Sequence, residues 1–129
     1  MLTNEQRDHL IQAALNVRRW AYVPYSHYSV GAALLTSSGK IYDGCNIENA
    51  AYSVTVCAER VAVFKAVSEG EQQIEAVAIV TEKGNAPCGS CRQVLNEFGP
   101  DCLVICANLR GDRRVATLAA LLPDAFGPW

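Results

Sequence analysis

Three cysteines and one glutamate stand in two short motifs whose residue types and spacing suit metal chemistry. Cys57 and Glu59 form a Cys-x-Glu motif, and Cys88 and Cys91 follow later in a Pro-Cys-x-x-Cys motif. Structural zinc sites close the metal with four protein ligands, whereas catalytic sites use three and leave one position to water. Neither of the two histidines stands in ligand spacing to a cysteine. The count of motif cysteines therefore favours an open, catalytic zinc site.

Glu59 supplies the proton-transfer group that such a site needs. Zinc acidifies water towards neutral pH, and a nearby carboxylate can take the proton and pass it to a substrate. On a regular helix, however, residues two positions apart point about 200° away from each other. We therefore expect the metal to lie off the end of a helix that begins near Cys57, because only that arrangement lets Cys57 and Glu59 share one site.

The composition limits the classes of partner. The chain has 129 residues, half of them apolar, which predicts one compact domain over residues 1–129. A net charge of −2 and basic runs as short as Arg113-Arg114 argue against nucleic-acid binding, which needs clustered Lys and Arg. The N-terminal residues 1–10 lack an apolar leader, and no stretch approaches the length of a membrane span. We expect a cytoplasmic protein that binds neither nucleic acid nor membrane.

The other three cysteines are expected to pack in the core. Without a secretion signal, six cysteines are better interpreted as reduced thiols than as three disulfides. Cys45, Cys102 and Cys106 lie in apolar, strand-like runs, where a free cysteine behaves as a small buried hydrophobe.

The order of strand-like and helical segments predicts an α/β protein. A short loop with Gly39 joins the first two strands as an antiparallel hairpin. The run 76–80 is apolar on both faces, as expected of a central strand between helices. The last two strands should be antiparallel, because the gap between them is too short for a crossover helix. The expected strands are 28–35, 40–46, 76–80, 102–106 and 113–116. The expected helices are 3–20, a second that begins near Thr55 or Cys57 and ends at Gly70, 88–98 and 118–122.

This arrangement places all three motif cysteines in the first turns of two helices. Helix N-termini carry partial positive charge and free N–H groups, which favour the thiolate form that binds metal. Arg60 and Arg92 are the candidate donors to the sulfur atoms, and we favour Arg60. For Arg92, an exposed helix charge is an equally good interpretation.

These residues give the chain a resemblance to the small, homotetrameric, zinc-dependent cytidine deaminases. The Cys-x-Glu and Pro-Cys-x-x-Cys motifs are the cysteine form of the zinc-deaminase signature. The resemblance covers nearly the whole chain and rests on five blocks in the family's order. The blocks are 24–26 with 30–34, 46–52, 57–60, 87–94 and 121–123.

The resemblance implies a fold and a set of metal-site roles. The fold would have three layers, with a mixed five-stranded sheet, helices on both faces and the last two strands antiparallel. Cys57, Cys88 and Cys91 would hold one Zn²⁺ per subunit, and Glu59 would be the proton shuttle. Arg60 would donate hydrogen bonds to the zinc thiolates and partly offset their charge.

The resemblance also implies substrate contacts from more than one subunit. Asn46 and Glu48 match the pair that holds the ribose hydroxyls in the family. Phe126 resembles an aromatic residue that a neighbouring subunit lays over the pyrimidine ring. Ala51 and Tyr52 resemble a loop that neighbours insert at the site, so active sites would be shared within a homotetramer.

Three positions depart from the family pattern. Tyr28 stands where Phe is usual on the pocket wall, Val61 where Thr is common, and Asp124 where Gly is common. Tyr28 adds a hydroxyl to an apolar wall, so the property that it affects is base selectivity rather than the reaction.

The resemblance implies hydrolytic deamination of cytidine and deoxycytidine to uridine and deoxyuridine, with release of ammonia, in pyrimidine salvage. A deaminase of a modified cytosine nucleoside, such as blasticidin S, would use the same metal chemistry. A structural zinc domain would need a fourth ligand and would give Glu59 no task. A redox dithiol at Cys88 and Cys91 would leave Cys57 idle.

Overall fold

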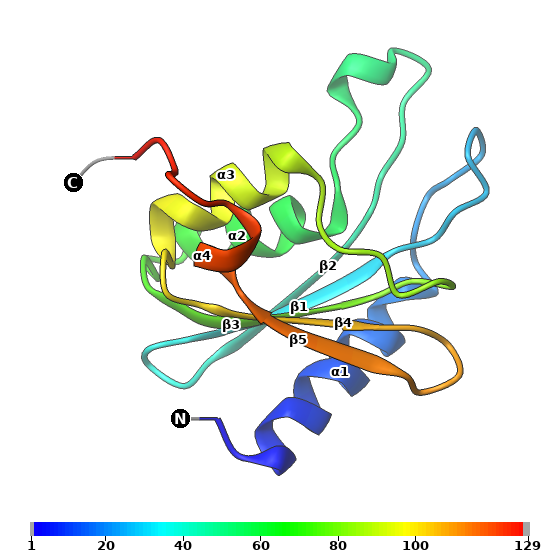
Figure 1. The fold of residues 1–129 in the computed structure, drawn as a ribbon. Coiled ribbons are helices and arrows are strands. Elements are labelled where there is room, and N and C mark those ends of the chain that lie inside the picture. The colour runs from blue at the N-terminus through cyan, green and yellow to red at the C-terminus, as the bar shows by residue number, and fades with distance from the viewer. Residues whose placement is uncertain (1, 128–129) are drawn as a thin grey trace.

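Residues 2–127 are described by a computed structural model, in which a five-stranded sheet lies between layers of helices (Figure 1). The strand order is β2-β1-β3-β4-β5. The β3–β4 pair is parallel and the other neighbouring pairs are antiparallel, so the mixed sheet with antiparallel last strands is confirmed. The strands are β1 (Gly31–Thr36), β2 (Ile41–Cys45), β3 (Ile74–Val80), β4 (Leu103–Ala107) and β5 (Arg113–Thr117); the helices are α1 (Asn4–Arg18), α2 (Ala58–Ser68), α3 (Gly89–Phe98) and α4 (Leu118–Leu121).

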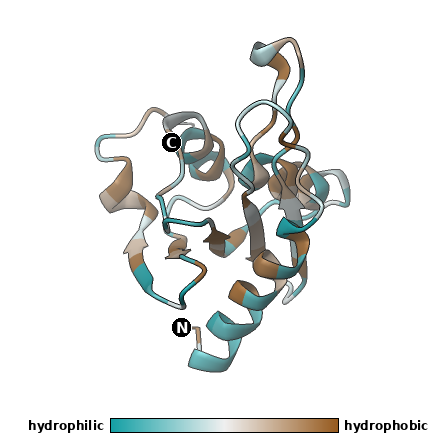
Figure 2. Ribbon diagram, turned by 90° about the vertical axis from the view of Figure 1, so that its right-hand side faces the viewer, coloured by the Kyte–Doolittle hydropathy of each residue, from teal (hydrophilic) through white to brown (hydrophobic). Residues whose placement is uncertain are grey.

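Helix α1 begins at a capping box formed by Thr3 and Gln6. The Gln6 backbone N–H donates to the Thr3 hydroxyl (3.1 Å), and the Thr3 N–H donates to the Gln6 side chain (2.9 Å). Leu10 and Ala14 are the buried residues of this helix. In Figure 2, α1 alternates hydrophilic and hydrophobic bands along its length, as expected of a helix with one face on the sheet.

Two apolar layers cover the two faces of the sheet. Residues of β1, β3 and β4 alternate between a cluster under α1 and a cluster under α2, α3 and α4 (Figure 1). Strand β3 is buried on both sides, as predicted for the central strand. Cys45, Cys102 and Cys106 are buried, so their assignment to packing is confirmed. The sheet thereby holds α2 and α3 side by side on one face, with their N-termini at the same end.

Strand β1 begins at Gly31, three residues later than the expected start at Tyr28. The Asn46 side chain engages both the Val30 N–H and the Tyr28 carbonyl, each at 2.9 Å. Residues 28–30 therefore lie beyond the end of β1 and do not continue its hydrogen bonds with the neighbouring strands.

Residues 46–57, between β2 and α2, form an arm that projects from the body of the protein (Figure 1). Bridges of Ile47 with Tyr22 and with Val56 hold its base, and its tip is the short 3₁₀ helix η1 (Tyr52–Val54). Tyr52 is 71% exposed and Val54 58%. Within the described residues, no helix is long and apolar enough to cross a membrane.

Candidate metal centre and active site

The three motif cysteines meet where two helices begin. Cys57 is the N-cap of α2, Cys88 is the N-cap of α3, and Cys91 lies in the first turn of α3. Their sulfur atoms all lie within 4.8 Å of one another, and those of Cys57 and Cys88 are 3.9 Å apart. Cys91 is fully buried. The sheet thus brings together two motifs that are distant in the sequence.

This donor set fits zinc. With Zn–S bonds of about 2.3 Å and tetrahedral angles, two thiolates on one zinc are about 3.8 Å apart, close to the Cys57–Cys88 separation. Thiolates are soft ligands that select zinc over hard cations. Among residues 2–127, no fourth His, Cys, Asp or Glu joins the group. The side chains present can therefore hold a metal with three sulfur ligands, as in a catalytic site.

Glu59 is buried beside this cluster. It lies in the first turn of α2 and is 5% exposed. Cys57 has extended backbone dihedrals (φ −70°, ψ 153°), so it stands outside the helix and the 200° separation does not apply. Burial raises the pKa of Glu59 to about 7. A carboxyl with such a pKa can both accept and donate a proton near neutral pH.

Close contact between β2 and α2 fixes the distance between the sheet and the helix that carries Glu59. Gly44 of β2 faces the start of α2, where an added Cβ would lie 2.7 Å from the Ala58 carbonyl oxygen and 2.6 Å from the Ala62 nitrogen. Only glycine allows this approach. The helix that carries Glu59 therefore sits directly on the sheet.

Arg60 and Arg92 differ in what they contact. Arg60 Nη2 lies 3.3 Å from Cys57 Sγ. The hydrogen bond with Cys91 and the Arg60 guanidinium lower the pKa of Cys57 to about 5. Arg92 is half-buried, and its guanidinium donates to the carbonyl oxygens of Pro87 and Leu121. Arg92 is therefore neither an exposed charge nor, in these contacts, a sulfur donor.

A cavity of about 170 Å³ opens beside the thiols. Cys57, Glu59 and Cys88 line it, together with Tyr28 and Asn46. Its remaining lining residues are Val30, Ala58, Ile79, Thr81, Asn85 and Ala86. Two of the motif cysteines, the Glu59 carboxyl group and two of the predicted substrate residues thus line one small pocket.

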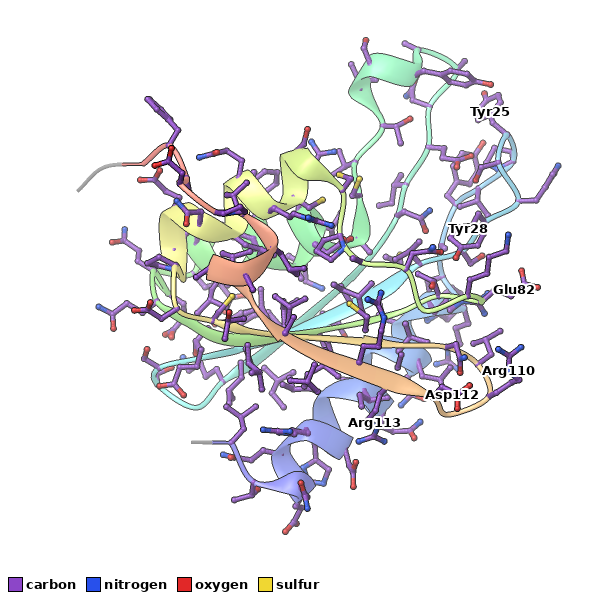
Figure 3. All side chains as sticks on the ribbon, in the orientation of Figure 1. Tyr25, Tyr28, Glu82, Arg110, Asp112 and Arg113 are labelled. Atoms are coloured by element: carbon purple, nitrogen blue, oxygen red, sulfur yellow. The ribbon has the colours of Figure 1, made fainter. Side chains whose placement is uncertain are left out.

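Thr81 and Asn85 are pocket residues that the sequence analysis missed. The Thr81 hydroxyl accepts from the backbone N–H groups of Gly84 (2.7 Å) and Asn85 (3.0 Å), which folds the loop after β3. The Tyr28 hydroxyl donates to the Asn85 side chain and accepts from the Lys83 N–H (3.4 Å). Figure 3 shows Tyr28 on the same side of the molecule as Glu82 of this loop. The sequence signal that could have identified these two residues is the position of their loop, which follows the central strand and directly precedes the Pro-Cys-x-x-Cys motif.

Glu48 lies in an adjacent hollow rather than in the metal pocket. This hollow, of about 290 Å³, is also lined by Tyr25, Ser26, Tyr52 and Thr55. The Glu48 carboxylate accepts from the N–H groups of Tyr25 (3.0 Å) and Ser26 (3.1 Å) and from the Ser26 hydroxyl. These hydrogen bonds, led by that of the Ser26 hydroxyl, lower the pKa of Glu48. Glu48 therefore holds the 25–26 turn while its carboxylate stays near the surface.

Ala51 and Phe126 lie away from both hollows. Ala51 is exposed on the projecting arm, and Phe126 is 82% exposed near the C-terminus. The Phe126 carbonyl accepts from the side chains of Gln93 (2.9 Å) and Asn96 (3.3 Å) of α3. Asp124 has φ 52°, a left-handed backbone conformation that glycine adopts with the least strain.

The fold and site together define a zinc-dependent enzyme class in which three thiolates hold the metal and one carboxyl group transfers protons. Comparison with known proteins gives the family. The family model "Cytidine and deoxycytidylate deaminase zinc-binding region" matches residues 4–107, and the chain belongs to this family.

Individual relatives agree over nearly the full length of both chains. The chain is 53% identical over 122 residues to a cytidine deaminase of Sporosarcina psychrophila (92% of this chain, 90% of that protein). It is 50% identical over 123 residues to one from Halalkalibacterium halodurans (93% of each). The crystal structure of cytidine deaminase from Burkholderia pseudomallei superposes with a TM-score of 0.90 at 47% identity, covering 97% of this chain and 100% of that one.

Proposed function

We propose that this protein is a zinc-dependent cytidine deaminase that hydrolyses cytidine and deoxycytidine to uridine and deoxyuridine, with release of ammonia. The observation that carries the proposal is Glu59, a carboxyl group 5% exposed and lining the same pocket as the thiols of a family metal site. A structural zinc domain would have no use for a buried carboxyl at this position.

Cys57, Cys88 and Cys91 are the residues that hold the metal. When bound, zinc lowers the pKa of water and stabilises negative charge on oxygen as a Lewis acid. Arg60 keeps a positive charge next to the thiolate of Cys57, with Nη2 3.3 Å from the sulfur. This charge partly offsets the net negative charge of a three-thiolate site.

Glu59 moves the protons of the reaction. It takes one proton from the attacking water and delivers it to N3 of the pyrimidine, and it then takes the second proton from the new hydroxyl group on C4 and delivers it to the amino group, which leaves as ammonia. Burial raises the pKa of this carboxyl, which favours a group that accepts a proton and gives it back. Burial keeps bulk water from competing for these protons.

The remaining pocket residues bind and orient the nucleoside. Tyr28 and Asn46 line the pocket, so we assign Tyr28 to the wall beside the base and Asn46 to a ribose hydroxyl. Glu48 is assigned to the second ribose contact, at the edge of the adjacent hollow. Both Asn46 and Glu48 are already held by backbone hydrogen bonds, which keeps them oriented before the substrate arrives.

We further propose a homotetramer with shared active sites. Ala51, Tyr52 and Phe126 are exposed in the single chain and lie outside its metal pocket, which fits residues that serve a neighbouring subunit. The projecting arm also exposes Ile47 and Val54, apolar side chains that an interface would cover.

The biological setting follows from the same assignment. We propose that one deaminase domain spans residues 1–129 and acts in pyrimidine salvage in the cytoplasm. The free thiols of all six cysteines fit a reducing compartment.

A nucleoside panel tests the proposal. Absorbance assays with cytidine, deoxycytidine, CMP and blasticidin S should show turnover of the first two, loss of that turnover with a zinc chelator, and its return on adding zinc. Turnover of blasticidin S with inert cytidine and deoxycytidine would favour a deaminase of a modified nucleoside instead. Absence of turnover with all four compounds by the zinc-loaded protein would contradict the proposal.

A further inference from the structure

Arg92 joins two backbone segments that are far apart in the sequence. Its Nε donates to the Pro87 carbonyl oxygen, and its Nη1 donates to the Leu121 carbonyl oxygen, each at 2.8 Å. Pro87 directly precedes Cys88, and Leu121 ends helix α4. One guanidinium therefore joins the backbone before Cys88 to the C-terminal segment 118–127.

At the first end, the Arg92 guanidinium holds the backbone directly before Cys88 through the Pro87 carbonyl oxygen. The Cys88 carbonyl accepts from the Arg92 backbone N–H (3.0 Å), which is the ordinary helical hydrogen bond at this position. The Cys88 residue itself is exposed and its side chain makes no helix-capping hydrogen bond. Apart from its contact with the Cys57 sulfur at 3.9 Å, the position of this sulfur thus depends on its backbone. Hydrogen bonds from a charged donor are among the stronger restraints on a backbone.

At the second end, Arg92 donates a hydrogen bond to a carbonyl group at the end of a very short helix. Helix α4 has four residues, and the last carbonyl groups of any helix lack partners within it. Arg92 supplies one for Leu121. Gln93 and Asn96, further along α3, donate to the Phe126 carbonyl, so side chains of α3 hold both ends of the segment 121–126.

We propose that Arg92 is a positioning residue that couples the metal ligand Cys88 to the C-terminal segment 118–127. If the two hydrogen bonds of the Arg92 guanidinium hold Cys88 in the position that binds metal, then bound metal must stabilise these hydrogen bonds to the same extent, because coupling between two sites is reciprocal. Metal loading therefore orders the C-terminal segment, and metal loss loosens it.

The consequence for catalysis rests on the proposed function. If Phe126 completes the pocket of a neighbouring subunit, Arg92 links the metal content of one site to the aromatic residue that its subunit offers to another. The coupling itself needs only the metal ligands and is measured without substrate.

Two variants and a matched control test the coupling. Arg92→Met keeps the aliphatic stem and removes the guanidinium, and Arg92→Lys keeps the charge but replaces the rigid planar fork of N–H donors with a single ammonium group. Arg110→Met removes an arginine whose side chain is 78% exposed, in the β4–β5 turn (Figure 3). Zinc release to a chromogenic chelator and hydrogen exchange of residues 118–127, with and without zinc, are the two readouts, and helix α1 is the internal reference.

Both Arg92 variants should release zinc roughly 10- to 100-fold faster than the wild type, while Arg110→Met should not differ. Removing zinc from the wild type should accelerate exchange in 118–127 more than in α1, and in Arg92→Met exchange there should be fast with or without zinc. Gln93→Ala should loosen the end of the segment without changing zinc release.

Wild-type zinc release from Arg92→Lys, or equal exchange of 118–127 in zinc-loaded and zinc-free wild type, would overturn the proposal. The wild-type comparison decides the question even if both Arg92 variants fold poorly. Cytidine turnover by the wild type, measured in parallel, shows separately whether the proposed function holds.

Discussion

Arg60 reaches back to Cys57 across the first turn of α2, with Nη2 3.3 Å from the sulfur. The Arg60 Nε is buried without a hydrogen-bond partner in the described part of the chain. The contact through Nη2 brings the positive charge of the guanidinium next to this thiol. This charge stabilises the thiolate that binds metal.

Replacing Arg60 should weaken metal binding. We expect Arg60→Gln to lower zinc affinity roughly 10- to 100-fold, because a residue that orients and charges a ligand is lost. Competition with a chelator of known affinity measures this, with Arg110→Gln as the surface control. Equal affinities of Arg60→Gln and the wild type would show that the contact is structural only.

Glu59→Gln should separate proton transfer from metal binding. The amide keeps the size of the side chain but cannot accept a proton, so we expect turnover to fall by about 10²- to 10⁴-fold with zinc content unchanged. Glu59→Ala should behave in the same way. The measurements are steady-state deamination of cytidine and zinc analysis of the same samples. Turnover near the wild-type rate would remove Glu59 from its proposed role.

Glu48 should make stability depend on acid pH. Its pKa in the folded protein lies below the ordinary value of 4.5, so its contribution to stability is complete above pH 4.5 and is lost as the pH falls through the folded-state pKa. Thermal unfolding at a series of pH values should show wild type more stable than Glu48→Gln near neutral pH, with a gap that narrows in acid. Ser26→Ala should reduce the same gap, because the Ser26 hydroxyl is the leading cause of the lowered pKa. A gap that stays constant or widens in acid would contradict this assignment.

Gly44→Ala should disturb the site from the sheet side. The new methyl group would have to displace the backbone of α2 at Ala58 and Ala62, which we expect to destabilise the protein by about 1–3 kcal/mol and to lower turnover. Gly89→Ala is the matched control, since nothing lies within 4 Å of an added Cβ there. Chemical denaturation compares the two. Equal stability of Gly44→Ala and the wild type would mean that α2 can move without penalty.

The cluster of three cysteines and most of the fold could be predicted because the sequence patterns that indicate them are local. Motif spacing put the cysteines at helix starts, and the N-cap geometry of Cys57 then resolved how Glu59 can face the same site. Periodicity and loop length were enough for the helices and for the antiparallel pairs β1–β2 and β4–β5, whereas the antiparallel pairing of β1 with β3 was not predicted. The start of β1 was misplaced because the Asn46 side chain, distant in sequence, takes the hydrogen bonds of residues 28–30.

The contacts of Arg92 and Asn85 could not be predicted, since they depend on which backbone or side chain tertiary packing brings nearby. A charge pattern on one helix does not reveal that Leu121 ends another helix within reach of Arg92. Likewise, the hydrogen-bond partner of Asn85 is Tyr28, which is distant in the sequence but adjacent in space.

X-ray absorption spectroscopy of the zinc-loaded protein tests the central claim most directly, because it counts the sulfur ligands. Three sulfur atoms at about 2.3 Å and one oxygen at a shorter distance are the predicted result. Four sulfur ligands, or three sulfurs with a nitrogen from the protein, would contradict the account of an open catalytic metal beside Glu59.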